Sequence, residues 1–142
     1  MPETRTLVKQ LQNVNYSAVA NPLSSLYQNS NGWVLSVISA AEGGGRTFQE
    51  AQNYYLSKNF HPSEIHASFD KNIKKSLDEV FGDWVESQVR LDDHDQLERV
   101  TGWLKFVSAA SVFDFLRRTD HLKSEFEICH AQGCNRPLNL SN

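Results

Sequence analysis

The sequence has few or none of several features, and each absence excludes a class of protein. Its 142 residues include only two cysteines, which in a cytosolic protein are usually reduced thiols rather than a disulfide. The longest apolar stretch, from Trp103 to Leu116, is broken by polar and charged residues, so it predicts no membrane span. Polar residues follow Met1 where a secretory signal needs a basic and then an apolar run. We therefore expect no membrane association and a cytoplasmic protein.

Excess charge is also lacking, because the net charge at neutral pH is only −3. A globally basic surface for nucleic acid is excluded, although a local basic patch is not. With 39% hydrophobic and 11% aromatic residues, the composition is that of a folded protein. A chain of this length can bury roughly 70% of its unfolded surface, so one domain needs no metal or disulfide for stability.

Hydrophobic residues recur at helical spacing along most of the chain. This spacing predicts a mostly α fold, a compact helical bundle of about five or six helices with a less regular N-terminal quarter. The expected helices cover residues 4–14, a stretch starting at Pro22, 48–57, 62 to about 90 with a break at Gly82, 96 to about 118, and 121 to about 131. We expect a single helical domain over residues 1–142, with an N-terminal segment (1–45) that ends in a Gly-rich linker, a main bundle (46–133) and a polar tail (134–142).

Residues 33–41 (WVLSVISAA) are open to two interpretations. The β-favouring residues after the Asn31-Gly32 turn are compatible with a hairpin strand. Continuation through Ala41 to a glycine stop is typical of a buried helix, which we favour. Elsewhere the start signals are clearer, since Thr47 with Glu50 three residues on has the spacing of a capping box. Asp95 with Glu98 repeats this spacing.

Three glycines, Gly43 to Gly45, precede Arg46 and Thr47 at the start of the helix predicted over residues 48–57. Free backbone N–H groups there are able to hold an anion, with help from Arg46. The phosphate-binding loop pattern requires a lysine that is missing here. We interpret the glycines as a flexible linker.

Four residues near the C-terminal end are candidate metal ligands, namely His121, Cys129, His130 and Cys134. On a helix, Cys129 faces the same way as His121, but His130 points about 100° away. The spacing matches no strong zinc template, since a second cysteine pair is missing. We favour a buried Cys129 that packs as a small hydrophobic residue, and we expect no cofactor.

The acidic run LDDHD, residues 91–95, resembles a divalent-cation loop only superficially. It lacks the central glycine and the twelve-residue frame of a calcium loop. Acidic residues at a helix N-terminus, favoured by the helix dipole, explain it. His61 and His66 are five residues apart, whereas the zinc-protease motif needs four. No serine stands in a nucleophile-elbow context, and no triad is evident by spacing.

The absence of catalytic motifs favours a non-enzymatic interaction protein, such as an adaptor, inhibitor or assembly factor, whose partner is another protein. Tyr54 and Tyr55 cannot both face inward on one helix, so one of them is the expected contact. The alternative is a nucleic-acid-binding regulator that uses the helix face of Lys71, Lys74 and Lys75. A second alternative is a small Cys/His metalloprotein built on the four candidate ligands.

Overall fold

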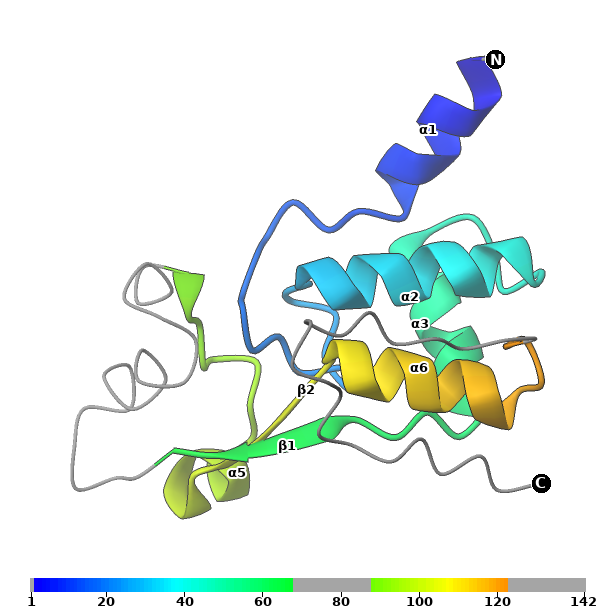
Figure 1. Ribbon diagram of the computed structural model, residues 1–142. Helices are drawn as coiled ribbons and strands as arrows, with labels where there is room; N and C mark the ends of the chain where they lie inside the picture. Colours follow the sequence, from blue (N-terminus) through cyan, green and yellow to red (C-terminus); the bar gives the residue numbers. More distant parts are fainter. Residues whose placement is uncertain (1, 68–87, 123–142) are drawn as a thin grey trace, which may run out of the picture.

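The computed structural model describes residues 2–67 and 88–122, which form a mixed α/β fold (Figure 1). Its elements are α1 (Pro2–Gln10), α2 (Ser30–Ala41), α3 (Phe48–Ser57), β1 (Ser63–His66), α5 (Gln96–Thr101), β2 (Trp103–Phe106) and α6 (Ala109–Arg118). The two strands pair antiparallel, with Ser63 opposite Phe106 and His66 opposite Trp103. The prediction of a mostly α helical bundle is therefore wrong.

The long helix expected over residues 96–118 is the largest error. Gly102 adopts a left-handed conformation with φ 78° and ends α5 after six residues. Ser108 then begins α6, since its side chain accepts a hydrogen bond from the backbone N–H of Ser111. The residues between them, WLKF, form β2. Hydrophobic spacing alone hid the glycine stop and the serine start, because both fit within a helical pattern.

The helix expected from Pro62 onward begins instead as a strand. Ile65, which lies within that predicted helix, pairs with Leu104 across the sheet. The remainder of that predicted helix after Ala67 lies outside the described residues, as do the predicted helix after His121 beyond Leu122 and the polar tail. The helix predicted at Pro22 is also absent, since residues 20–28 form turns and an isolated bridge.

Local capping signals were read correctly. Residues 33–41 are helical, within α2, whose N-cap Asn29 accepts a hydrogen bond from Gly32 N at 2.7 Å. The capping box of Thr47 and Glu50 is present at the start of α3. The box of Asp95 and Glu98 is present at the start of α5. These signals depend on residues three apart, so distant parts of the chain cannot override them easily.

The larger core cluster joins helices from both sides of the glycine turn, which is formed by Gly43 to Gly45. It consists of Leu35 from α2, Tyr55 from α3, Phe60, Val107, and Val112 and Phe115 from α6. The rings of Tyr55 and Phe115 both pack edge-on against Phe60, with centroid distances of 5.2 and 6.0 Å. Figure 1 shows α2 and α6 running across the body of the fold, while α1 projects away from it. The predicted N-terminal segment therefore shares a core with residues beyond 46.

The glycine turn is tightly packed at one position. A side chain at Gly44 would meet Tyr54 Cγ at 2.5 Å and Ser39 O at 2.6 Å. Gly43 and Gly45 have positive φ angles of 90° and 106°. The turn is thus a fixed connection between α2 and α3 in which glycine is needed for space and for backbone conformation.

A second, smaller cluster lies at the sheet and joins four separate segments. It contains Val19, Ala67, Val89 and Leu104, all of them buried. Leu104 faces this cluster from β2, while the neighbouring Trp103 faces outward. None of the helices within 2–67 and 88–122 has the length and apolar character needed to cross a membrane.

The two phenylalanines of α6 allow a matched test of this packing. Phe115 is fully buried, whereas Phe113 on the same helix is about half exposed. We expect Phe115→Ala to lower the free energy of unfolding by about 3–5 kcal/mol, since it leaves a cavity against Phe60. Phe113→Ala should cost less than about 1 kcal/mol. Urea unfolding followed by circular dichroism measures both, and equal losses would contradict this assignment of the helix faces.

Candidate functional site

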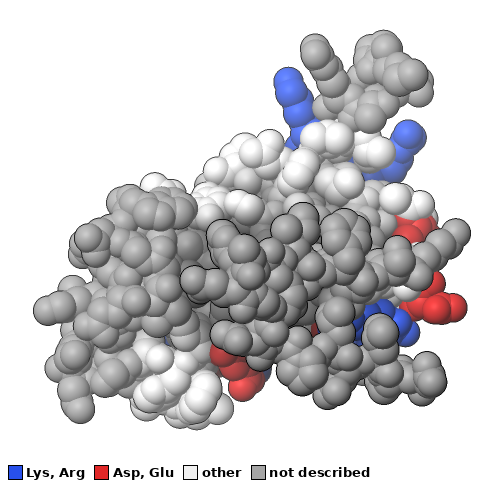
Figure 2. Space-filling model, in the orientation of Figure 1, with Lys and Arg blue, Asp and Glu red and all other residues white. Residues whose placement is uncertain are grey.

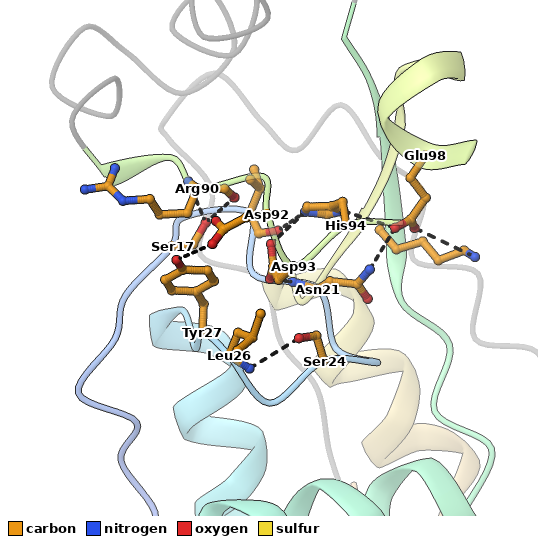
Figure 3. A network of polar contacts seen from close by, with 12 residues as sticks. Ser17, Asn21, Ser24, Leu26, Tyr27, Arg90, Asp92, Asp93, His94 and Glu98 are labelled. Atoms are coloured by element: carbon orange, nitrogen blue, oxygen red, sulfur yellow. Dashed lines mark hydrogen bonds and ion pairs between the residues drawn. The ribbon is translucent and has the colours of Figure 1, made fainter. Parts of the chain in front are cut away.

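A buried network of polar side chains surrounds His94 (Figure 3). Asp93, His94 and Glu98 come from the connection before α5 and from α5 itself, while Asn21 comes from the segment before α2. All four residues are buried. Charged and polar groups in such a place must find partners, because leaving one unpaired costs several kcal/mol.

Both ring nitrogens of His94 face hydrogen-bond acceptors. Nε2 lies 2.8 Å from the backbone oxygen of Val19, and Nδ1 lies 3.2 Å from Glu98 Oε2. A carbonyl oxygen only accepts, so Nε2 carries a hydrogen. Glu98 Oε2 also accepts from Asn21 Nδ2 at 2.8 Å, so one hydrogen, carried by Nδ1 or by the carboxyl group, joins His94 to this oxygen.

Asp93 lies on the other side of the ring. Its Oδ2 accepts a hydrogen bond from Asn21 N at 2.7 Å, and its Oδ1 is 3.6 Å from His94 Nε2. Burial raises the pKa of Asp93, while the Asn21 N–H and the nearby imidazole act to lower it. Asp93 Oδ1 and Glu98 Oε1 are buried without a hydrogen bond, and Lys105 Nζ is 3.9 Å from the latter.

Further contacts join the same two segments at the edge of the network. Ser17 Oγ donates to the backbone oxygen of Arg90 at 3.0 Å and accepts from Arg90 N at 3.1 Å. Tyr27 donates its hydroxyl hydrogen to Asp92 Oδ2 at 2.8 Å. Residues 17–27 and 88–98 are therefore held together by hydrogen bonds along much of their length, as Figure 3 shows.

This network has no access for a substrate, because the side chains of His94 and Asp93 are 0% exposed. In the part of the chain that the structure describes, no three His, Cys, Asp or Glu side chains form a group that could hold a metal ion. The contacts of the network join α5 to the segment before α2. Sequence reasoning placed residues 91–95 at a helix N-terminus, which holds for the N-cap Asp95. It missed the burial of Asp93 and His94.

The opposite side of α5 presents apolar side chains to solvent. Leu97 and Val100 are 69% and 66% exposed, and Trp103, just after the helix, is 52% exposed. The imidazole of His66 lies against the Trp103 ring with a centroid distance of 4.8 Å. We call Leu97, Val100 and Trp103 the α5 apolar face. Large apolar side chains exposed close together in the sequence often mark an interaction site.

Neither Tyr54 nor Tyr55, which were predicted to bind a partner, belongs to the α5 apolar face. Tyr55 is buried in the core. Tyr54 is half-buried, donates to Glu42 Oε2 at 3.3 Å and lies beneath the ammonium group of Lys58. The tyrosine pair thus offers a partner at most the outer part of Tyr54. Lys71, Lys74 and Lys75 lie outside the described residues.

Of the four candidate metal ligands, only His121 is described. Its Nδ1 lies 3.2 Å from Glu42 Oε1 near the end of α2, with the side chain about half exposed. This contact is a surface ion pair when the imidazole is protonated. Cys129, His130 and Cys134 lie outside the described residues, so the metal site stays an untested prediction.

The fold and the network define a small α/β domain in which a buried polar network around one histidine positions a short helix with exposed apolar side chains. A family model described as "Uncharacterized protein conserved in bacteria (DUF2145)" matches residues 2–116, and the chain belongs to this family. The match covers α1 through most of α6 and includes every residue of the network. No curated protein matches the chain, and no solved structure does.

The side chain of Asn21 provides a direct test of the network. Asn21→Ala removes the amide that donates to buried Glu98, so we expect the free energy of unfolding to fall by about 2–3 kcal/mol. Asn13→Ala is the control, because the Asn13 amide also donates to backbone oxygens but is exposed. Its cost should be about 1 kcal/mol or less. Similar losses in urea unfolding for both variants would show that the network contributes no more than a surface contact.

Proposed function

We propose that this protein is a non-enzymatic protein-binding domain, an adaptor, inhibitor or regulatory factor, that binds another protein through the α5 apolar face. One observation carries the proposal. Three large apolar side chains that are each more than half exposed come from a six-residue helix and the residue at the start of the following strand. A short helix gains nothing for its own stability by presenting these side chains to water.

The composition of the face and of its surroundings supports a protein as the partner. Tryptophan is among the residues that contribute most to protein–protein binding, and Trp103 is the aromatic member of the face. Charged residues of both signs lie on these elements and on the paired strand, namely Arg99 on α5, Lys105 on β2 and Glu64 on β1. An apolar centre with a polar rim of mixed charge is typical of a protein interface.

Nucleic acid is the less favoured partner. Among the described residues on the side shown in Figure 2, basic and acidic side chains are scattered, and no broad patch of one sign is visible. Phosphate binding requires several Lys or Arg side chains gathered along one surface. The lysines on which that alternative rests are outside the described residues, so it stays a prediction.

A double serine substitution on the α5 apolar face tests the proposal, with a single serine substitution elsewhere on the surface as the control. Val100→Ser removes an apolar side chain from the α5 apolar face, while Val14→Ser is a matched control at a valine that is 91% exposed elsewhere. We expect Leu97→Ser and Val100→Ser together to weaken partner binding at least tenfold, since interface anchors are worth about 1–2 kcal/mol or more each. Val14→Ser should bind as the unchanged protein does. Both proteins should stay folded, because the changes are at the surface.

The measurement is quantitative capture of interacting proteins from the source cells, followed by a binding titration with the purified partner. Mass photometry of the purified protein shows whether the bound chain is a second copy instead. A partner that binds the double serine variant as tightly as the unchanged protein would remove the α5 apolar face as the binding site.

A further inference from the structure

The outer edge of β1 carries backbone groups that point away from its partner strand. Ala67 N donates to Gly102 O at 2.8 Å, which marks this pair as a hydrogen-bonded position of the antiparallel ladder. Hydrogen-bonded and non-hydrogen-bonded positions alternate along such a ladder, so the N–H and C=O groups of Glu64 and His66 point away from β2. Within residues 2–67 and 88–122, no strand or loop pairs with these outward groups.

The same residues of β1 carry a pattern of charge on the exposed face of the sheet. Glu64 lies opposite Lys105 in the register, and His66 lies opposite Trp103. Glu64, His66 and Trp103 are exposed, whereas Ile65 is half-buried and packs against the core cluster on the other face. A carboxyl group and an imidazole therefore lie two positions apart on one face, beside the unpaired edge.

We propose that β1 pairs antiparallel with β1 of a second copy of this chain, with Ile65 at the two-fold axis, so that the two sheets join into one within a symmetric dimer. In this register Glu64 lies opposite His66 of the second copy. The outward backbone groups of these two residues then exchange N–H to O=C hydrogen bonds. This surface is distinct from the α5 apolar face, so the dimer goes beyond the proposed function and does not depend on it.

The side chains favour this register over the other symmetric ones that the backbone allows. Outward groups occur at every second residue of β1, so the alternatives place Glu64 opposite Glu64, or His66 opposite His66. The first alternative brings two carboxylates together, which is destabilising. The second is centred on the last residue of β1, so the outward groups of Glu64 gain no partner within the strand. In the proposed register each carboxylate faces an imidazole, whose N–H donates to it in either charge state of the ring.

The remaining side chains of the sheet fit the same arrangement. On the exposed face, a continuous row runs from Lys105 and Glu64 to His66 and Trp103 of the second copy. The ring of His66 already lies against that of Trp103, with a centroid distance of 4.8 Å, so its position on the strand is fixed. On the other face, the two Ile65 side chains meet across the axis. A two-stranded sheet is marginal alone, and pairing of the edges extends it over an apolar face.

A disulfide at the axis tests the register directly. Residues opposite each other at a non-hydrogen-bonded position have Cα atoms about 4.5 Å apart, which a disulfide can span. We therefore expect Ile65→Cys to form an intermolecular disulfide under mild oxidation, in a chain that also carries Cys129→Ser and Cys134→Ser. Glu64→Cys in the same background is the control, because the two copies of this position lie about 8–9 Å apart in the proposed register.

Non-reducing electrophoresis and mass spectrometry measure the cross-link. A disulfide at Glu64→Cys in place of Ile65→Cys would overturn the register, and no disulfide at either position in a dimeric sample would overturn the interface. Sedimentation velocity of the unchanged protein decides independently of these variants. It should show a reversible monomer–dimer equilibrium between about 1 and 200 µM, and a monomer throughout that range would reject the proposal.

Substitutions of opposite charge at His66 test the side-chain pairing. His66→Lys and His66→Glu both remove the ring that lies against Trp103, but they place opposite charges beside Glu64 of the second copy. We expect the dimer of His66→Glu to be at least about tenfold weaker than that of His66→Lys, because like charges directly opposite each other are destabilising. Val14→Lys and Val14→Glu change the net charge equally at a residue that is 91% exposed elsewhere, and should dimerise alike. Equal dissociation constants for the two His66 variants would contradict the pairing.

Failure of the dimer and failure of the proposed function give different results. The double variant Leu97→Ser with Val100→Ser is expected to weaken partner binding, but it lies on α5 and should leave the dimer unchanged. Loss of the dimer in this variant would show that the second copy binds through the α5 apolar face, which would reject the β1 pairing. A cross-link at Ile65→Cys, with partner binding unaffected by the serine substitutions, would reject only the proposed binding face.

Discussion

The described fold depends on one contact between distant parts of the chain, that of Asn21 with Asp93 and Glu98. The backbone N–H of Asn21 binds the first carboxylate and its side-chain amide binds the second, across 72 and 77 residues of sequence. The elements nearby are weak by themselves, since a two-stranded sheet and a six-residue helix are both marginal in water. Through Asn21 and the carbonyl of Val19, they are joined to the segment that leads into α2.

The network fixes geometry more than it adds stability. Burying His94 beside two carboxyl groups has a desolvation cost that their contacts offset only in part, and buried polar pairs of this kind are often no more stable than apolar substitutes. Apolar side chains here would pack without a directional preference, whereas the two ring nitrogens of His94 need hydrogen-bond partners in fixed directions. That requirement sets where Glu98 lies and therefore how α5 is oriented.

Features that depend on residues close together in the sequence were predicted correctly, whereas features that depend on contacts between distant residues were missed. The capping boxes at Thr47 and Asp95 and the helix over 33–41 were found, because their signals lie within a few residues. The strands were missed because Ile65 and Leu104 also fit helical spacing, and only their pairing across 39 positions makes them β. A histidine within an acidic run was a usable signal for the network. Its partners Val19 and Asn21 carry none, since their role appears only when the chain is folded.

The two sides of the short helix α5 lie in opposite environments. Glu98 is buried beside His94, whereas Leu97 and Val100 are exposed to water. Exposing these apolar side chains has a free-energy cost that folding alone does not require. An apolar side chain on a surface helix turn can usually be replaced by a polar one without loss of stability. The exposed apolar side of this helix contributes little to folding. Under the proposed function, this side is held ready for a partner, because a preordered face loses less entropy on binding.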